Sequence, residues 1–359
     1  MAKNIYIGES SVARKVKKAY IGINGVARKI KKMYIGVAGI ARLFFSSAAE
    51  VNIVESAIED MRYAKYTFAS TATDSHAIFA GGGYSSGEAY NEELVRSNVE
   101  LSLIANHHGA ATINNNAIFH GDTTAFDVVD TSLTRTTITS GYGWSANTLI
   151  GGENKKYAVF GTGASSGTFV TCLNESLTFS YTSLSTSAGN YSNTISTSDY
   201  IAFNLLNGSM DVFDTSLTMT TVEGIQSAQG CAGGNIDGCL AIAGGISSGV
   251  IVNTINIFDT SLTKVATTNM SSVRYFPIAT SLGNYLLVGG GTDGASAIDT
   301  VDIFDNSFTL VKTLNMSVAR YAPCAETIGN YALFAGGSSL SSNWNNGKEI
   351  SVDAFVLDE

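Results

Sequence analysis

The sequence predicts an all-β protein, a seven-bladed β-propeller that follows a small N-terminal module of β-hairpins. Of its 359 residues, 45% are hydrophobic and 14% are charged, and Ser, Thr and Asn fill the gaps between short apolar runs. This composition is typical of chains with many strands and turns. No amphipathic helix pattern persists over three turns. Two internal repeats, a short one at the N-terminus and a long one over the rest, complete the prediction.

The long repeat is an apolar run that ends in a small residue and returns every 39 to 47 residues. It occurs seven times, and the residues that mark its end are Ala80, His120, Gly161, Asn204, Ala243, Val288 and Ala335. A unit of this length accommodates the four strands of a propeller blade. Seven units therefore predict seven blades.

A turn motif lies between these runs. Its copies are "VVDTSLT" (128–134), "CLNESLT" (172–178), "VFDTSLT" (212–218), "IFDTSLT" (257–263) and "IFDNSFT" (303–309). An Asp or Asn followed by Ser or Thr supplies side-chain hydrogen bonds that stabilise a tight turn. Each copy predicts the connection between the third and fourth strands of a blade.

The two ends of the long repeat complement each other. The last unit ends with "ISVDAFVLDE" (350–359), which matches a third strand without a fourth, whereas residues 50–64 match the end of a fourth strand. We therefore expect residues 47–359 to form the propeller, closed by strand 51–54 pairing with 350–357. This closure removes an exposed sheet edge.

The glycine pair that ends strand two, followed by a strand and an Asp-containing turn, resembles the kelch repeat. The resemblance covers about residues 50–359 and implies a kelch-like propeller. Two features depart from it, because the glycine pairs of blades two to four are degraded and the tryptophan common in the fourth kelch strand is missing.

A meander of antiparallel strands gives the propeller two faces. The loops between strands two and three and those between blades share one face, which we call the loop face. The motif turns and the turns between strands one and two share the other, the turn face. The chain is expected to join the ring at the turn face, which leaves the loop face pointing away.

The short repeat forms residues 1–46. Its three copies are "IYIGESSVARKVKK" (5–18), "AYIGINGVARKIKK" (19–32) and "MYIGVAGIARLFFS" (33–46). The recurring residues, fourteen apart, are Tyr6, Tyr20, Tyr34, Arg14, Arg28 and Arg42. Asn24-Gly25 is a strong signal for a two-residue hairpin turn. Small hairpins are marginal alone, so we expect a partner surface or further copies, that is, an anchor or assembly module.

Charge separates the two parts. Residues 1–46 carry ten Lys or Arg against one acidic residue, a net +9, whereas the remainder carries eleven against 29, a net −18. Such asymmetry indicates a tail with its own partner. The acidic bulk argues against nucleic acid as a ligand of the propeller. No apolar run is long enough to insert into a membrane, and no signal-peptide core is visible.

The repeated YIG…VARK segments resemble the N-terminal segments of tail-associated proteins from phages and phage-like particles of Gram-positive bacteria. The resemblance covers residues 1–46 only. It implies that these residues bind phage tail or baseplate proteins and could form a homo-oligomer, and that the protein is a virion component made in the host cytoplasm. The alternative is a basic segment that docks onto the acidic propeller of its own chain or onto nucleic acid.

Arginine-tyrosine pairs recur before three blades as Arg62-Tyr63, Arg274-Tyr275 and Arg320-Tyr321, and His107-His108 has a similar place before blade two. One hypothesis is a cationic arc on the loop face that binds an anionic polymer such as a teichoic acid. The alternative is that these arginines join neighbouring blades. Trp344 and Tyr84 lie in loops between strands two and three, where aromatic rings suit sugar recognition.

Catalysis is not expected. The four histidines all lie in blades one and two, which makes it hard to assemble a channel-centred copper site of the sort found in some kelch-like sugar oxidases. Glu92-Glu93 is placed on a strand, which points the two carboxylates to opposite faces. Neither a metal nor a cofactor is therefore predicted.

Together these observations predict a non-enzymatic phage or phage-like tail component that attaches to the bacterial surface, with the loop face binding a carbohydrate. The alternatives are a structural or decorating virion protein that binds only other particle proteins and, third, a sugar-modifying enzyme. The attachment function depends on analogy, because a fold does not state its function.

Overall fold

The structure is a computed structural model of the whole chain. It describes six strands within residues 6–46 and then residues 52–65, 68–102, 109–121, 124–141, 149–162, 168–186, 194–205, 207–225, 229–340 and 347–357. The chain divides into two compact units, Met1–Asn52 and Ile53–Glu359. The boundary thus lies six residues beyond the end of the fourteen-residue repeats.

The first unit contains three separate antiparallel hairpins, one for each copy of the short repeat. They pair β1 (Tyr6–Glu9) with β2 (Val12–Lys15), β3 (Tyr20–Ile23) with β4 (Val26–Lys29), and β5 (Lys32–Val37) with β6 (Ile40–Ser46). In the central hairpin Ile23 lies opposite Val26, and the predicted turn residues Asn24 and Gly25 lie outside the described residues. The repeated tyrosines and arginines lie on the strands, and their side chains are outside the description.

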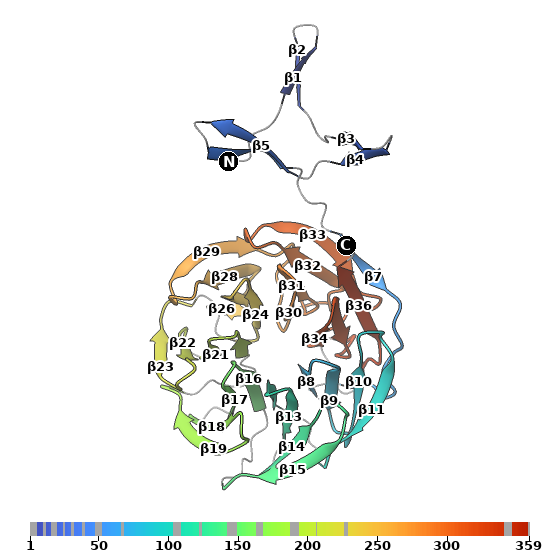
Figure 1. Cartoon of the computed structure of the whole chain (residues 1–359). Helices are drawn as coiled ribbons and strands as arrows, with labels where there is room; N and C mark the ends of the chain where they lie inside the picture. Colours follow the sequence, from blue (N-terminus) through green and yellow to red (C-terminus); the bar gives the residue numbers. More distant parts are fainter. Residues whose placement is uncertain are drawn as a thin grey trace. The chain divides into compact units, whose positions relative to one another are not determined.

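The second unit is a seven-bladed propeller, so the predicted fold class is confirmed. Figure 1 shows the four-stranded antiparallel sheets arranged around a central axis, with the first strand of each blade innermost. Blades one to three are β8 (Phe68–Ala72), β9 (Ala77–Gly81), β10 (Ser86–Tyr90), β11 (Arg96–Glu100); β12 (Gly109–Ile113), β13 (Asn116–His120), β14 (Ala125–Val129), β15 (Arg135–Thr139); β16 (Leu149–Glu153), β17 (Tyr157–Thr162), β18 (Phe169–Asn174), β19 (Phe179–Ser183).

The other four blades follow in the same order. They are β20 (Thr194–Ser196), β21 (Ile201–Asn204), β22 (Met210–Phe213), β23 (Met219–Val222); β24 (Ala232–Ile236), β25 (Cys239–Ala243), β28 (Thr254–Phe258), β29 (Lys264–Asn269); β30 (Ile278–Leu282), β31 (Tyr285–Gly289), β32 (Thr300–Phe304), β33 (Leu310–Asn315); β34 (Cys324–Ile328), β35 (Tyr331–Ala335), β36 (Val352–Leu357) and β7 (Ile53–Ser56). The second strands are almost fully buried and the fourth strands form the exposed rim.

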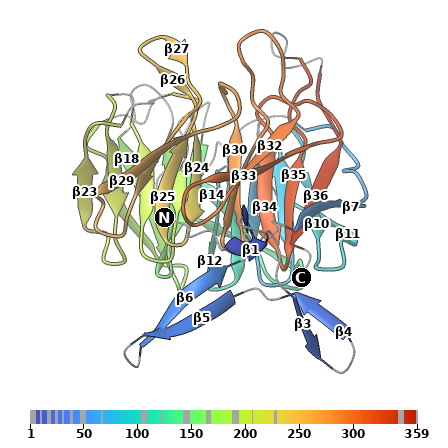
Figure 2. The same cartoon turned by 90° about the horizontal axis from the view of Figure 1, so that it is seen from above.

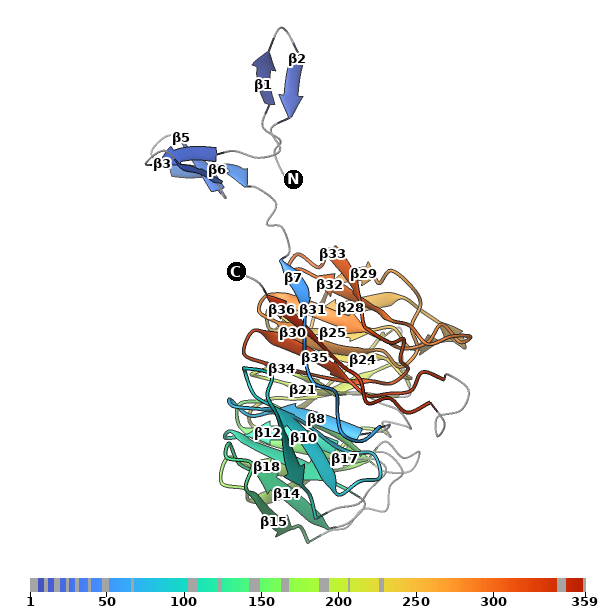
Figure 3. The same ribbon diagram turned by 90° about the vertical axis from the view of Figure 1, so that its right-hand side faces the viewer.

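The outer strand of blade seven comes from the start of the propeller. β7 pairs antiparallel with β36, with Ser56 opposite Ala354 and Ile53 opposite Leu357, and Figure 3 shows the two strands side by side. The observed strands are Ile53–Ser56, two residues later than the predicted 51–54, and Val352–Leu357, which begins two residues later than the predicted 350–357 and ends at the same residue. The ring is thus held closed by one hairpin-like pairing between the two ends of the unit.

The motif turns share one geometry. In the copy at Asp214, the carboxylate Oδ1 accepts the backbone N–H groups of Ser216 (2.8 Å) and Thr218 (2.9 Å). Leu217 adopts a left-handed conformation with φ of 60°, as does the matching Leu or Phe in the other copies. Asn91 makes the same bonds, so "NEELV" (91–95) is a sixth copy that the sequence analysis missed. Glu92 and Glu93 consequently lie in a turn, and their predicted place on a strand is wrong.

The two faces of the ring differ in what protrudes from them. Figure 2 shows the ring from its edge, with the ribbon β26 (Ile246–Ser247) and β27 (Val250–Ile251) extending from the loop face. The core lies between the sheets, where phenylalanines such as Phe79 and Phe334 are fully buried. Over the described part of the chain, none of the elements is a helix of the length and apolarity that a membrane span needs.

Candidate functional site: the central channel and two cavities

The seams between blades repeat one polar contact. An acidic residue on the third strand of a blade accepts the backbone N–H and hydroxyl of a serine that leaves the preceding blade. Ser185 donates in this way to Asp211 (2.6 and 2.9 Å), and Ser271 donates to Asp302 (2.8 and 2.9 Å). The same contact joins Ser102 to Asp127, and the backbone N–H of Ser317 to Asp353. We call each of these serine-to-carboxylate contacts between neighbouring blades a latch. The carboxylates are buried, and a buried charge is tolerated only when it is hydrogen-bonded.

Arg274 and Arg320 belong to these latches. Both side chains are completely buried. Arg274 donates to the carbonyl oxygens of Gly290 (3.0 Å) and Thr300 (2.7 Å) and pairs with Asp302 at 3.1 Å. Arg320 makes the equivalent contacts with two carbonyl groups and Asp353. Neither guanidinium is therefore presented on the loop face, and these two residues do not form the surface of the hypothesised cationic arc.

The equivalent basic residue of blade one is Lys65. Its ammonium pairs with Glu88 at 2.9 Å and donates to the carbonyl of Ser86, and its own carbonyl accepts the N–H of Gly337, as Arg320 accepts that of Gly291. Burial lowers the pKa of Lys65. The residue that matches Arg320 is thus Lys65, and the prediction that matched Arg62 to Arg320 was out of register by three residues.

The predicted aromatic residues separate into two groups. Tyr275 and Tyr321 both pack against Phe276, and Tyr321 is buried. Tyr63 is 40% exposed and stacks on Tyr84 with ring centroids 5.1 Å apart, next to the exposed Arg62. The structure therefore brings Arg62, Tyr63 and Tyr84 together on the loop face of blade one. Trp344, His107 and His108 lie outside the described residues.

A belt of hydrogen bonds surrounds the central channel. Hydroxyl groups on the innermost strands donate to carbonyl oxygens of the neighbouring blade. Examples are Thr112 to Ala72 (2.6 Å) and Thr327 to Ser281 (2.6 Å). Further links of this kind run from Ser70 to Ala325, from Thr194 to Gly151 and from Ser281 to Asn235. The channel wall is consequently polar and held from blade to blade.

Glycines allow this close approach. A Cβ on Gly151 would lie 2.4 Å from the carbonyl oxygen of Ala110, and one on Gly233 would lie 2.3 Å from that of Thr194. Both glycines begin Gly-Gly pairs on innermost strands, in "LIGGE" and "AGGNI". They differ from the glycine pairs at the ends of second strands, on which the sequence analysis concentrated.

Two glutamates on the innermost strands have displaced pKa values. Burial raises the pKa of Glu153 in blade three to about 7, partly offset by the N–H of Thr112, which donates to its Oε2 at 3.3 Å. Burial, with repulsion from Glu153, raises the pKa of Glu326 in blade seven to about 8. Both side chains are half-buried. Displaced pKa values of this kind concentrate at functional sites.

Glu153 lines a cavity of about 370 Å³ at the turn-face mouth of the channel. Its walls come from the turns between the first and second strands of blades two, three and four, with one contribution from blade five. The other lining residues are Thr112, Ile113, Asn114, Asn154, Lys155, Ser196, Thr197, Ser198 and Asn235. Lys155 is paired with Asp199 at 2.5 Å, so Glu153 is the principal charge directed at the cavity.

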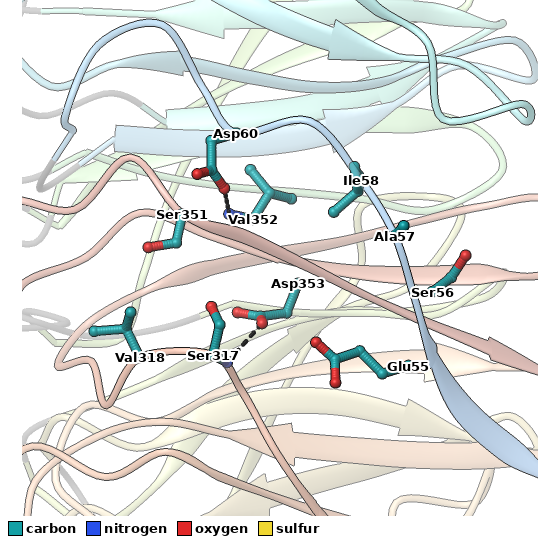
Figure 4. A pocket seen from close by; sticks show the side chains of 10 residues that line it. All are labelled: Glu55, Ser56, Ala57, Ile58, Asp60, Ser317, Val318, Ser351, Val352 and Asp353. Carbon is teal, nitrogen blue, oxygen red and sulfur yellow. Dashed lines mark hydrogen bonds between the residues drawn. The ribbon is translucent and has the colours of Figure 1, made fainter.

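A second cavity of about 430 Å³ lies beside the ring-closing strands. Figure 4 shows its lining, with Asp353 bonded to the N–H of Ser317 and Asp60 bonded to that of Val352. Glu55 completes a set of three carboxylates around it. The described residues nevertheless contain no group of three or more His, Cys, Asp or Glu placed to hold a metal ion.

Lys65, Glu153 and Glu326 were not among the site residues predicted from the sequence. A Glu at the end or middle of an inner strand, in "LIGGE" and "CAETI", interrupts the small and apolar residues expected there. This interruption is the feature of the sequence that could have indicated the two glutamates. It is recognised only after the innermost strands have been identified.

No family model and no curated protein matches the sequence. Solved propellers do match the structure. A streptogramin B lyase structure has 11% identity and a TM-score of 0.60 over 87% of this chain and all of its own. A catalytically inactive virginiamycin B lyase from Staphylococcus aureus with quinupristin has 14% identity and a TM-score of 0.62, over 85% of this chain and 99% of its own. BBS1N in complex with ARL6DN has 10% identity and a TM-score of 0.56, over 87% of this chain and 98% of its own.

These neighbours correct the predicted function. The prediction of a non-enzymatic phage tail component that attaches to a bacterial surface is wrong. The similar structures include an enzyme, a lyase, and nothing in them supports a phage or tail component. At identities of 10 to 14% the likeness establishes the seven-bladed propeller and no particular activity.

Proposed function

We propose that the propeller binds a small polar molecule at the turn-face mouth of its central channel. The observation that carries the proposal is the half-buried carboxylate of Glu153 in a cavity of about 370 Å³. Hydroxyl and amide groups of Ser196, Thr197 and Asn235 surround it. Ligand sites commonly combine such a concave shape with a few polar groups that fix the orientation of the ligand.

The ligand carries a positive group. Removal of Glu153 from water disfavours its ionised form, which explains the raised pKa. A bound cation would reverse that effect, because an opposite charge nearby favours ionisation. Binding should therefore become tighter as the pH rises through about 7, where Glu153 loses its proton.

The test is a binding screen with the full chain. A panel of small primary amines and amidines is titrated by calorimetry at pH 6 and at pH 8. A ligand of this site binds more tightly at pH 8, and Glu153→Gln removes that difference. Glu175→Gln is the matched control, because Glu175 is exposed on the same face and pairs with Lys156. Equal binding by the wild type and Glu153→Gln contradicts the proposal.

A second candidate is acid-base chemistry at the same channel. It is favoured by the two carboxyl groups with pKa values of about 7 and about 8, since groups that titrate near the working pH are the most effective proton carriers. Some propellers of similar fold are described as lyases. Turnover of a bound compound, followed by NMR and lost in Glu326→Gln with binding retained, would separate catalysis from binding alone.

Two earlier expectations remain proposals. The kelch-like nature of the repeats is supported by glycine pairs in left-handed conformation at the ends of second strands, such as Gly290-Gly291 (φ of 67° and 94°). An assembly role of residues 1–46, with a partner protein or further copies of the chain, is supported by the net charge of +9. Light scattering of the full chain at low and high salt tests self-association, which should weaken with salt if charge contributes.

A further inference from the structure

Three of the four latches have a third component on the outer strand of the blade that holds the acid. A threonine hydroxyl there donates to Oδ1 of the buried aspartate. Thr137 donates to Asp127 at 2.7 Å, Thr221 to Asp211 at 2.7 Å and Thr313 to Asp302 at 2.8 Å. In each case the threonine and the aspartate are directly paired across the two strands. The carboxylate thus accepts donors both from the preceding blade and from its own outer strand.

Blade seven lacks this component. The pairing of Ser56 with Ala354 places Ala57 opposite Asp353, where blades two, four and six have threonine opposite their aspartate. The methyl side chain of alanine has no hydrogen-bond donor. In addition, β7 ends at Ser56, so the chain leaves the sheet at this point. The cavity of about 430 Å³ lies here, with Ala57, Ser56 and Asp353 in its lining.

The carboxylate of Asp353 is 2% exposed and lies at this cavity. Its Oδ2 pairs with Arg320 and its Oδ1 accepts the N–H of Ser317 at 2.7 Å. A carboxylate has about four lone-pair sites, so Oδ1 can accept a further donor from the side that threonine occupies elsewhere. The close-up shows the Glu55 side chain extending toward Asp353, whereas the hydroxyl of Ser56 points away from it (Figure 4).

We propose that this cavity is a binding site for a primary ammonium group, one of whose N–H bonds donates to Asp353 in place of the missing threonine hydroxyl. A second N–H bond is directed at the carboxylate of Glu55. Carboxylates accept such charge-assisted bonds well. The site differs from the channel mouth, because it joins β36 to β7 at the ring closure, and its occupation stabilises the closed ring.

The experiment compares two salts on the full chain. Thermal unfolding is followed in methylammonium chloride and in tetramethylammonium chloride at equal concentration, because the second cation has the charge and no N–H donor. Methylammonium should raise the midpoint above that in tetramethylammonium. At ten times the dissociation constant, the unfolding equilibrium moves about elevenfold toward the folded state. Equal midpoints in the two salts overturn the proposal.

Variants at the exposed Ala57 locate the effect. Ala57→Thr supplies the hydroxyl, so it should raise the midpoint in the absence of amine and abolish the difference between the two salts. Ala57→Val has the same shape without the donor, and it should not reproduce the gain in midpoint. Ala57→Thr that keeps the methylammonium effect, or that is no more stable than Ala57→Val, overturns the proposal. An effect of Glu153→Gln on the salt difference would assign the amine to the channel mouth and overturn it also.

Discussion

The guanidinium of Arg274 lies 3.1 Å from the carboxylate of Asp302, and both side chains are completely buried at the seam between blades five and six. The loss of one partner of a buried ion pair leaves an uncompensated charge and typically costs 3–5 kcal/mol. Arg274→Met should therefore lower the free energy of unfolding by about 3–5 kcal/mol, measured by urea denaturation.

Arg62→Met is the matched control for this prediction. Arg62 is exposed, and surface substitutions usually change stability by less than about 0.5 kcal/mol. Equal costs for the two variants would contradict the assignment of Arg274 to the seam. The comparison also decides the alternative left open by the sequence, since a residue that only binds a surface ligand would not affect unfolding so strongly.

The motif turns should tolerate asparagine and reject alanine. Asp214 accepts two backbone N–H groups and the hydroxyl of Ser216 (2.7 Å). Asn174 accepts the equivalent N–H groups of Ser176 and Thr178 at 3.0 Å in blade three. Asp214→Asn should therefore be nearly neutral, whereas Asp214→Ala should cost about 1–2 kcal/mol. Denaturation curves that rank the two variants equally would contradict this account of the turn.

The fold could be predicted from the sequence because each blade repeats its own signals. The apolar second strand and the Asp-Thr-Ser turn are local, and seven copies compensate for the degraded ones. The complementary chain ends were also visible, although both closing strands begin two residues later than predicted. The chain itself thus carries enough local information for the architecture.

The candidate sites could not be predicted in the same way, because they depend on contacts between blades. Lys65 is recognised only when its carbonyl is seen to accept the N–H of Gly337, from the far end of the chain. Glu153 and Glu326 are 173 positions apart in the sequence and interact across the channel. The candidate site at Asp353 depends on Ala57, and its importance is visible only when the strand pairing places Ala57 opposite Asp353.

Close packing of the innermost strands gives a further prediction. Gly151→Ala places a methyl group 2.4 Å from the carbonyl oxygen of Ala110, and backbone atoms cannot yield as a side chain can. It should lower stability by at least about 1–3 kcal/mol. Gly141→Ala is the control, because among the described residues the nearest atom to its Cβ would be Tyr181 Oη, at an ordinary contact distance of 3.6 Å. Equal unfolding midpoints for the two variants would contradict the close approach of blades two and three.

The two channel glutamates predict a pH dependence of stability. Their pKa values rise from the ordinary 4.5 to about 7 for Glu153 and about 8 for Glu326. Between pH 4.5 and 8 the folded state therefore binds more protons than the unfolded state, so stability falls as the pH rises through this window. Glu326→Gln cannot ionise, and it should flatten the upper part of the curve and raise stability at pH 8.5 by on the order of 2 kcal/mol. Urea denaturation at pH 5, 6.5 and 8.5 measures the effect, and a Glu326→Gln curve parallel to that of the wild type would show that this carboxylate ionises without cost.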